Sequence, residues 1–279
     1  MLSVEPCGFW PVATVVAEAG RRGVQVLAPC VNESEAGRWT VSERENEQAI
    51  RCSLAYVRGL GTAAAAVEGE RAARGSYTSL PDFCRRCDFL TREQLEWLVL
   101  SGALDSLLAN RRQALWALPA LHRGGNNASK NGVTGQTAAE LEVAPVLPPD
   151  LPEFTQAEAF LRECQALGFS PAGHPMLFHR ERLVAEGVRE CGSLQATRAG
   201  ERVTLAGLVI CPHRPPTAQG TVFFTLEDET GLAQVIVAPD VYERIGSDVY
   251  SHVALVVTGR AEGRGSGVNL LAEQTLVFG

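Results

Sequence analysis

A short segment with two glycines constrains the fold of this 279-residue chain more than any other. Residues 56–67 read Tyr-Val-Arg-Gly-Leu-Gly-Thr-Ala-Ala-Ala-Ala-Val, which predicts the end of one helix, a tight turn and the start of a second helix. Gly59 and Gly61 permit backbone conformations that a Cβ atom would block. We expect Leu60, between them, to be buried between the two helices. Thr62 is the expected N-cap of the second helix, because the alanines after it are strong helix formers.

Such a turn exposes backbone N–H groups at a helix N-terminus, where they are suited to bind phosphate. The pattern is typical of a helix-hairpin-helix motif, which holds the backbone of DNA without reading its sequence. The residues expected to contact that backbone are Arg58, Gly59, Leu60, Gly61 and Thr62. An ordinary turn between two helices, with no ligand, is the alternative interpretation.

A second pair of helices repeats this shape further along the chain. Thr91 is expected to cap a helix, residues 101–105 form the turn, and Asn110 opens the last helix. This turn has one glycine where the first turn has two. Arg111 and Arg112 are predicted to reach phosphate, although a solvated helix face explains these two arginines equally well.

The remaining elements follow from turn residues and apolar periodicity. In the first part of the chain we expect a helix over 11–23, a strand over 24–29, an amphipathic helix over 43–57, a helix over 62–73 and a short helix from Leu80. Residues 122–152 lack apolar periodicity and include four prolines after position 144, which predicts a flexible linker. Two short helices are expected in 155–187, separated by residues 168–175, which end in Gly173-His174-Pro175.

Residues 201–279 change to the alternating pattern of strands. The expected strands cover 202–210, 221–228, 232–237, 253–259 and 268–278, with a short helix over 239–245. Five strands with a helix between the third and the fourth is the order of an OB-fold barrel. The predicted fold class is therefore α+β with several domains, a tandem helix-hairpin-helix domain followed by a five-stranded OB-fold β-barrel.

OB-folds bind single strands through a basic groove and aromatic side chains that stack on bases. By strand position, the candidates for such contacts are Arg214, Phe223, Phe224 and Arg260. Adjacent residues of a strand point to opposite faces, so at most one of the two phenylalanines can stack on a base.

The charge is not that of a free-standing DNA-binding protein. The net charge is −7; residues 44–116 carry about +1 and residues 201–279 about −4. Either the partner is not nucleic acid, or the chain adds contacts to a larger basic surface. All but one of the 25 basic residues are arginine, which suits phosphate contacts but also follows from a GC-rich genome.

The eight cysteines do not predict a metal site. Cys84 and Cys87 form a single C-x-x-C pair, and no second pair follows at a useful spacing, so we expect ordinary reduced thiols. No apolar run is long enough to span a membrane, and the first residues lack the features of a signal peptide. A cytoplasmic location is the expectation.

The order of these motifs resembles one family of proteins. The motifs are the hairpin at 56–67, the segment Leu95–Asp105 with Asn110-Arg111-Arg112 behind it, Gly173-His174-Pro175, and the strand and turn at 223–231. Together they resemble the C-terminal part of the bacterial DNA polymerase III alpha subunit family, and most closely its error-prone branch. The resemblance covers nearly the whole chain except the linker, and residues 1–42 resemble a remnant of the fingers region.

The resemblance implies a DNA-binding portion of a polymerase that synthesises DNA across lesions and takes part in DNA repair. Its implied partners are duplex DNA and single-stranded template, the rest of the polymerase and mutagenesis accessory proteins. The family's magnesium ions are held by acidic residues of a palm region that nothing in this chain resembles, so we expect no catalytic residue, metal ligand or cofactor here and no activity of this chain alone. Asp228 and Glu229 are interpreted as turn residues.

The expected domains are 1–42 (fingers remnant), 43–121 (tandem helix-hairpin-helix), 122–152 (linker), 153–200 (helical connector) and 201–279 (OB-fold). The sequence leaves two other functions open. One is a stand-alone DNA-binding repair accessory, and the other is an OB-fold module that binds another protein.

Overall fold

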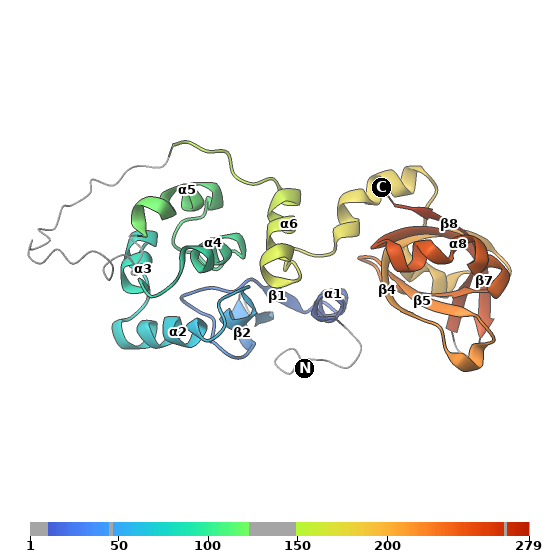
Figure 1. The fold of residues 1–279 in the computed structure, drawn as a ribbon, viewed down its shortest axis with the longest axis horizontal. Coiled ribbons are helices and arrows are strands. Elements are labelled where there is room, and N and C mark those ends of the chain that lie inside the picture. The colour runs from blue at the N-terminus through green and yellow to red at the C-terminus, as the bar shows by residue number, and fades with distance from the viewer. Residues whose placement is uncertain (1–10, 45–46, 123–148, 265–266, 279) are drawn as a thin grey trace, which may run out of the picture. The chain divides into compact units, whose positions relative to one another are not determined.

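The structure is a computed structural model that describes residues 11–44, 47–122, 149–264 and 267–278. The chain divides into two compact units (Figure 1). The helical unit is residues 24–171, and the barrel unit joins residues 11–23 to residues 172–278. The helix before residue 24 therefore belongs with the barrel, and the first part of the expected connector belongs with the helical unit. Most of the expected linker, 123–148, lies outside the described residues.

A small sheet opens the helical unit. Its strands are β1 (Gln25–Leu27), β2 (Thr40–Arg44) and β3 (Glu47–Arg51), in the order β1-β3-β2. β3 pairs parallel to β1 and antiparallel to β2, so it is the central strand. The strand expected near residues 24–29 is confirmed by β1.

The amphipathic helix predicted over 43–57 is wrong. That segment contains the end of β2, all of β3 and the short 3-10 helix η1 (Leu54–Tyr56). Ile50 pairs with Val26 of β1 on one side and with Val41 of β2 on the other. A three-residue strand such as β1 needs a neighbour for its backbone groups, and this pairing outweighs the amphipathic pattern of the apolar residues.

The helices of this unit follow the predicted order. They are α2 (Ala63–Arg74), α3 (Leu80–Arg86), α4 (Arg92–Leu100), α5 (Arg111–Leu121) and α6 (Gln156–Leu167). Thr91 and Asn110 cap α4 and α5 as expected, because each side chain accepts a hydrogen bond from the third helical N–H. None of the helices in the described parts of the chain is long and apolar enough to cross a bilayer.

The barrel unit contains the five predicted strands. They are β4 (Arg202–His213), β5 (Val222–Glu227), β6 (Leu232–Val237), β7 (Ala254–Arg264) and β8 (Gly267–Val277), with α8 (Pro239–Ser251) between β6 and β7. They close in the order β4-β5-β6-β8-β7, and β7 pairs back onto β4. Only β6 and β8 pair in parallel among the described strands of the barrel. This is the strand and helix order expected for an OB-fold, so the predicted fold class is confirmed.

Two strand glycines allow the barrel backbones to approach closely. A Cβ atom on Gly207 of β4 would lie 2.6 Å from the Glu227 carbonyl oxygen of β5, and one on Gly259 of β7 would collide with the Leu271 carbonyl of β8. Neither glycine has a positive φ, so the constraint is space and not backbone conformation.

An acidic turn joins the other elements of this unit to the barrel. Glu227 accepts a hydrogen bond of 2.7 Å from the Thr14 hydroxyl of α1 (Val12–Arg21), and Arg21 of the same helix lies 3.4 Å from its carboxylate. Asp228, fully buried, accepts from the turn N–H of Gly231 at 3.0 Å. Arg180, which begins α7 (Arg180–Ala185), donates to Asp228 at 2.8 Å and also pairs with Glu229. The expected turn role of Asp228 is present, and it extends to the packing of α1 and α7.

His174 is buried beside this turn. Its side chain is 6% exposed, and Nδ1 accepts a hydrogen bond of 3.2 Å from the Met176 N–H at the start of η2 (Pro175–His179). Nε2 has no partner among the described residues. Burial lowers the pKa of His174 to about 4. The ring is therefore neutral in the folded protein at neutral pH.

The tight approach at Gly207 leads to a stability prediction. Replacing Gly207 by alanine pushes β4 away from β5 and should lower the free energy of unfolding of the barrel unit by about 2–3 kcal/mol. Gly263→Ala is the matched control, since a Cβ there meets nothing within 4 Å. The urea midpoint of unfolding is measured for both variants, with proteolysis of the barrel unit as the signal for its unfolding. Equal midpoints for the two would contradict the close packing of β4 on β5.

The low pKa of His174 predicts a pH effect on stability. As the pH falls from 6.5 to 4, the unfolded chain binds a proton on this ring and the folded chain does not, so unfolding becomes more favourable. His174→Asn keeps an acceptor for Met176 and cannot titrate. Between pH 7 and 4 the parent chain should lose about 3 kcal/mol more stability than His174→Asn. His213→Asn, at an exposed histidine, is the control that should retain the parent's pH dependence.

Candidate nucleic-acid interface

The first hairpin, residues 57–62, has the backbone conformation that the glycines predict. Gly59 has φ +70° and Gly61 has φ +48°, and Leu60 between them is 1% exposed. The N–H groups of Leu60 and Ala63 are used in turn hydrogen bonds. Those of Gly59, Gly61 and Thr62 donate to nothing within the described chain, and all three residues are exposed.

Thr62 does not cap α2 with its side chain. It stands at the N-cap position with φ −65° and ψ −20°, and its hydroxyl makes no capping hydrogen bond. These angles are already helical, whereas a capping side chain needs an extended backbone to reach the next turn. The expected cap is wrong, and the consequence is an uncapped helix start.

Two other elements hold this hairpin in place. The Arg58 N–H donates to the Ala166 carbonyl of α6 at 2.8 Å, so this amide is not available to a ligand. The side-chain amide of Gln94, in the first turn of α4, donates to the Gly59 carbonyl at 2.9 Å. The Arg58 guanidinium lies 4.8 Å from the centre of the Trp97 ring, also on α4. The second pair of helices thus supports the first hairpin.

The hairpin contact of Gln94 was missed from the sequence. Gln94 also closes the capping box of α4 with Thr91, which is a local role within the first turn of the helix. Its Nε2 and Oε1 atoms serve different partners, Gly59 and the Thr91 N–H. A side-chain contact across 35 positions of sequence has no local pattern that predicts it.

The second turn is filled by side chains. Gly102 has φ +82°, and a Cβ atom there would lie 2.5 Å from Nη2 of Arg111. Arg111 pairs with Asp105 at 2.7 Å and with Glu163 of α6 at 3.0 Å, and its side chain is 13% exposed. Burial raises the pKa of Asp105 against the opposing effect of Arg111. Arg111 therefore joins the turn to α5 and α6.

Arg112 is also engaged within the unit. It pairs with Glu158 of α6 at 2.8 Å, and its guanidinium lies 4.5 Å from the centre of the Phe154 ring. Since Arg111 and Arg112 both bind carboxylates of α6, the geometry gives them a packing role. Their contact with phosphate stays a prediction.

The barrel residues predicted from strand position fall into two places. Phe224 is fully buried, whereas Phe223 faces outward and stacks on His213 with ring centres 5.5 Å apart. Arg214 follows His213 at the start of the β4–β5 connection, exposed and 4.9 Å from the Tyr242 ring. Arg260 lies on β7, where it pairs with Glu273 of β8 at 3.0 Å. The structure groups Phe223 with Arg214 at the β4–β5 connection and leaves Arg260 on another pair of strands.

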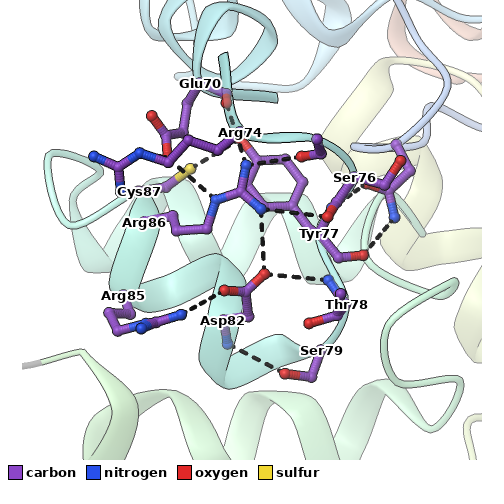
Figure 2. Close-up of polar contacts among 12 residues, drawn as sticks. Glu70, Arg74, Ser76, Tyr77, Thr78, Ser79, Asp82, Arg85, Arg86 and Cys87 are labelled. Atoms are coloured by element: carbon purple, nitrogen blue, oxygen red, sulfur yellow. Dashed lines mark hydrogen bonds and ion pairs between the residues drawn. The ribbon is translucent and has the colours of Figure 1, made fainter. Parts of the chain in front are cut away.

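The C-x-x-C pair is part of the core of the helical unit. Cys84 and Cys87 are buried, and burial raises the pKa of Cys84 to about 12 and that of Cys87 to about 11. The Tyr77 hydroxyl lies 3.3 Å from Sγ of Cys87 (Figure 2). No group of three or more histidine, cysteine, aspartate or glutamate side chains is placed to hold a metal ion within the described ranges.

Comparison with known proteins identifies the relatives of this chain. A helix-hairpin-helix motif family matches residues 23–114. The chain is 37% identical to the error-prone DNA polymerase of Symbiobacterium thermophilum over 97% of its own length and 28% of that protein. It is 35% identical to the error-prone DNA polymerase of Mycobacterium bovis over 98% of its length and 24% of that protein. The chain spans about a quarter of the length of these curated relatives.

A helix-hairpin-helix unit joined to a closed five-stranded barrel defines a chain of the DNA-binding class, related to polymerases. Its similarity to the error-prone enzymes extends over nearly every residue and is not limited to the hairpin. The chain belongs to the error-prone DNA polymerase family, which confirms the resemblance inferred from the motifs.

The buried position of Arg111 predicts the effect of removing it. Arg111→Gln leaves Asp105 and Glu163 without a cation, and we expect the helical unit to lose about 3–5 kcal/mol of stability. Arg112→Gln, at a pair that is one-third exposed, should cost under about 1 kcal/mol. Urea unfolding monitored by tryptophan fluorescence measures the loss of stability in both variants. A small effect of Arg111→Gln would contradict its packing role.

Proposed function

We propose that this chain is the DNA-binding portion of an error-prone DNA polymerase, and that residues 58–62 hold the backbone of duplex DNA. The observation that carries the proposal is the set of three N–H groups, on Gly59, Gly61 and Thr62, that are exposed and have no acceptor in the described chain. Backbone N–H groups at a helix start are a general site for phosphate, because they donate hydrogen bonds and carry the positive end of the helix dipole.

The surroundings of the hairpin support this assignment. Leu60 is buried and two hydrogen bonds reach the hairpin from α4 and α6, so the donors are fixed before a ligand arrives. A preorganised site loses little conformational entropy when it binds. Arg58 adds an exposed cation next to the N–H groups, and its stacking on Trp97 limits the conformations of its side chain.

The barrel is proposed to contact single-stranded template. Phe223 and His213 form an outward-facing aromatic pair at the β4–β5 connection, next to the exposed Arg214. Aromatic faces stack on bases of any sequence, and arginine adds attraction for the backbone. Arg260, paired with Glu273, is a weaker candidate for such a contact.

A protein-binding barrel is the second candidate, and one observation favours it. Val253, Leu276 and Val277 are large apolar side chains with 48–77% of their surface exposed, at adjoining ends of β7 and β8. Large exposed apolar side chains of this kind often mark a protein interface. The rest of the polymerase and accessory proteins of mutagenesis are the partners proposed for it.

For the complete polymerase we propose DNA synthesis across lesions and a part in DNA repair, in the cytoplasm. Magnesium would be held by residues of a palm region, which nothing in this chain resembles. The acidic turn at 227–229 does not fit a metal site, because its carboxylates are paired with Arg21 and Arg180. A stand-alone repair accessory would use the same hairpin, and binding of DNA without a polymerase partner would favour it.

The hairpin role predicts a loss of DNA affinity. Gly59→Val together with Gly61→Val places β-branched residues at positive φ and moves the N–H groups, so affinity for a duplex should fall at least about tenfold. Gly23→Val is the matched control, with φ +76° at an exposed turn outside the helical unit. Fluorescence anisotropy with a duplex of about 24 base pairs measures binding, and circular dichroism checks folding. Unchanged affinity would show that the hairpin is only a turn.

A further inference from the structure

An open pocket with a volume of about 370 Å³ lies in the helical unit, at the C-terminal end of α2. The side chains around it come from the end of α2, from the loop after it and from α3 (Figure 2). They are Arg74, Ser76, Thr78, Asp82, Arg85 and Arg86. None of these residues was a candidate for DNA binding in the sequence.

Arg86 lines the pocket, and its hydrogen bonds are all made within the fold. Its side chain is 8% exposed, and it lies 4.3 Å from the centre of the Tyr77 ring. Its Nε donates to Glu70, Nη1 donates to Asp82 and the Ser76 carbonyl, and Nη2 donates to the carbonyls of Glu70 and Gly75. A guanidinium used in this way fixes the loop between α2 and α3 and has no donor left for a ligand.

Asp82, which lines the pocket, and Glu70, which pairs with two of its arginines, already have their partners. Oδ1 of Asp82 accepts from Arg85 at 2.7 Å, and Oδ2 accepts from the Thr78 N–H at 3.2 Å and from Arg86 at 3.3 Å. Burial raises the pKa of Asp82, but these hydrogen bonds outweigh it and hold the pKa below its ordinary value. Oε1 of Glu70 lies 3.1 Å from Arg86 and 3.4 Å from Arg74. Asp82 is therefore held in its ionised form, and both carboxylates are occupied by arginines.

The groups that remain open around the pocket are hydrogen-bond donors. Arg74 is 69% exposed and uses only Nε, and Arg85 is 78% exposed and uses only Nη2, in the contacts of the described chain. The Ser76 and Thr78 hydroxyls make no hydrogen bond there either. Three arginines against two carboxylates leave a positive charge. Open guanidinium N–H groups with hydroxyls beside them suit a phosphate, which accepts several hydrogen bonds at once.

The pocket and the hairpin lie at opposite ends of α2. The helix has 12 residues, which at about 1.5 Å per residue separates its ends by about 18 Å. Base pairs of B-DNA are spaced by about 3.4 Å, so this length corresponds to about five base pairs. A duplex held at the hairpin therefore has further phosphates within reach of the other end of the helix.

We propose that Arg74 and Arg85 at this pocket bind a second backbone phosphate of duplex DNA, in addition to the one held by the hairpin. The inference rests on the proposed function of the hairpin and adds a contact that the helix-hairpin-helix pattern does not include. Two separated phosphate contacts fix the direction of the duplex along α2, which one contact cannot do.

The salt dependence of binding tests this contact. Removing one protein–phosphate contact reduces the steepness of log affinity against log salt by about 0.9. We expect Arg74→Gln together with Arg85→Gln to reduce this slope by about 1 and to weaken binding of a duplex of about 24 base pairs about tenfold at low salt. Both arginines are exposed, and their partners Glu70 and Asp82 keep their ion pairs with Arg86, so the circular dichroism melting curve should change little.

Arg38→Gln is the matched control, because Arg38 is 71% exposed and pairs with Glu35 three positions away, as Arg85 does with Asp82. It should leave slope and affinity unchanged. A double variant with the parent's slope, alongside weakened binding by Gly59→Val with Gly61→Val, would overturn the pocket and leave the hairpin standing. An equal reduction in Arg38→Gln would also overturn it, as an effect of net charge alone. No binding by the parent chain would overturn both proposals.

Discussion

The helical unit depends on how one leucine is buried. Leu60 can enter the core only because the glycines on either side adopt positive φ, and the same conformation turns the neighbouring N–H groups outward. The same backbone conformation therefore both buries Leu60 and exposes the N–H donors. Gln94 and the Ala166 carbonyl then fix the turn from two other helices. A donor set supported in this way stays in place without any ligand, which is what an anion site requires.

Arginine has two uses in this chain, and burial separates them. Arg86 and Arg111 are buried with carboxylates and join helices, while Arg58, Arg74 and Arg85 keep open N–H groups at the surface. The phosphate contacts proposed for the exposed arginines are therefore compatible with a net charge of −7. The carboxylates near the buried arginines form ion pairs that stabilise the fold. Exposed cations such as these three act locally, within the screening distance of about 10 Å at ordinary salt.

The barrel unit uses charge differently. Its acidic turn, Glu227 to Glu229, is paired with arginines of α1 and α7, so a segment before residue 24 and a segment after residue 171 are tied to the same strands. The sequence indicated a turn at this place, because aspartate before threonine and glycine accepts hydrogen bonds from its own loop. The partners Arg21 and Arg180 carried no such signal. Each carboxylate of the turn forms an ion pair with one of these arginines.

Strong local patterns determined much of this protein from sequence alone. The two-glycine hairpin, the caps at Thr91 and Asn110 and the alternating strands of the barrel are dictated by backbone conformation and by period, which short segments encode. The helix predicted over 43–57 failed because strand pairing with distant residues outweighed a local preference. Only the tertiary structure decided which arginines are buried, which element supports the hairpin and where the pocket beside Asp82 opens. These three features depend on contacts between residues far apart in the chain. Helices and strands produce a regular period in the sequence, whereas burial and ion pairing of single side chains do not.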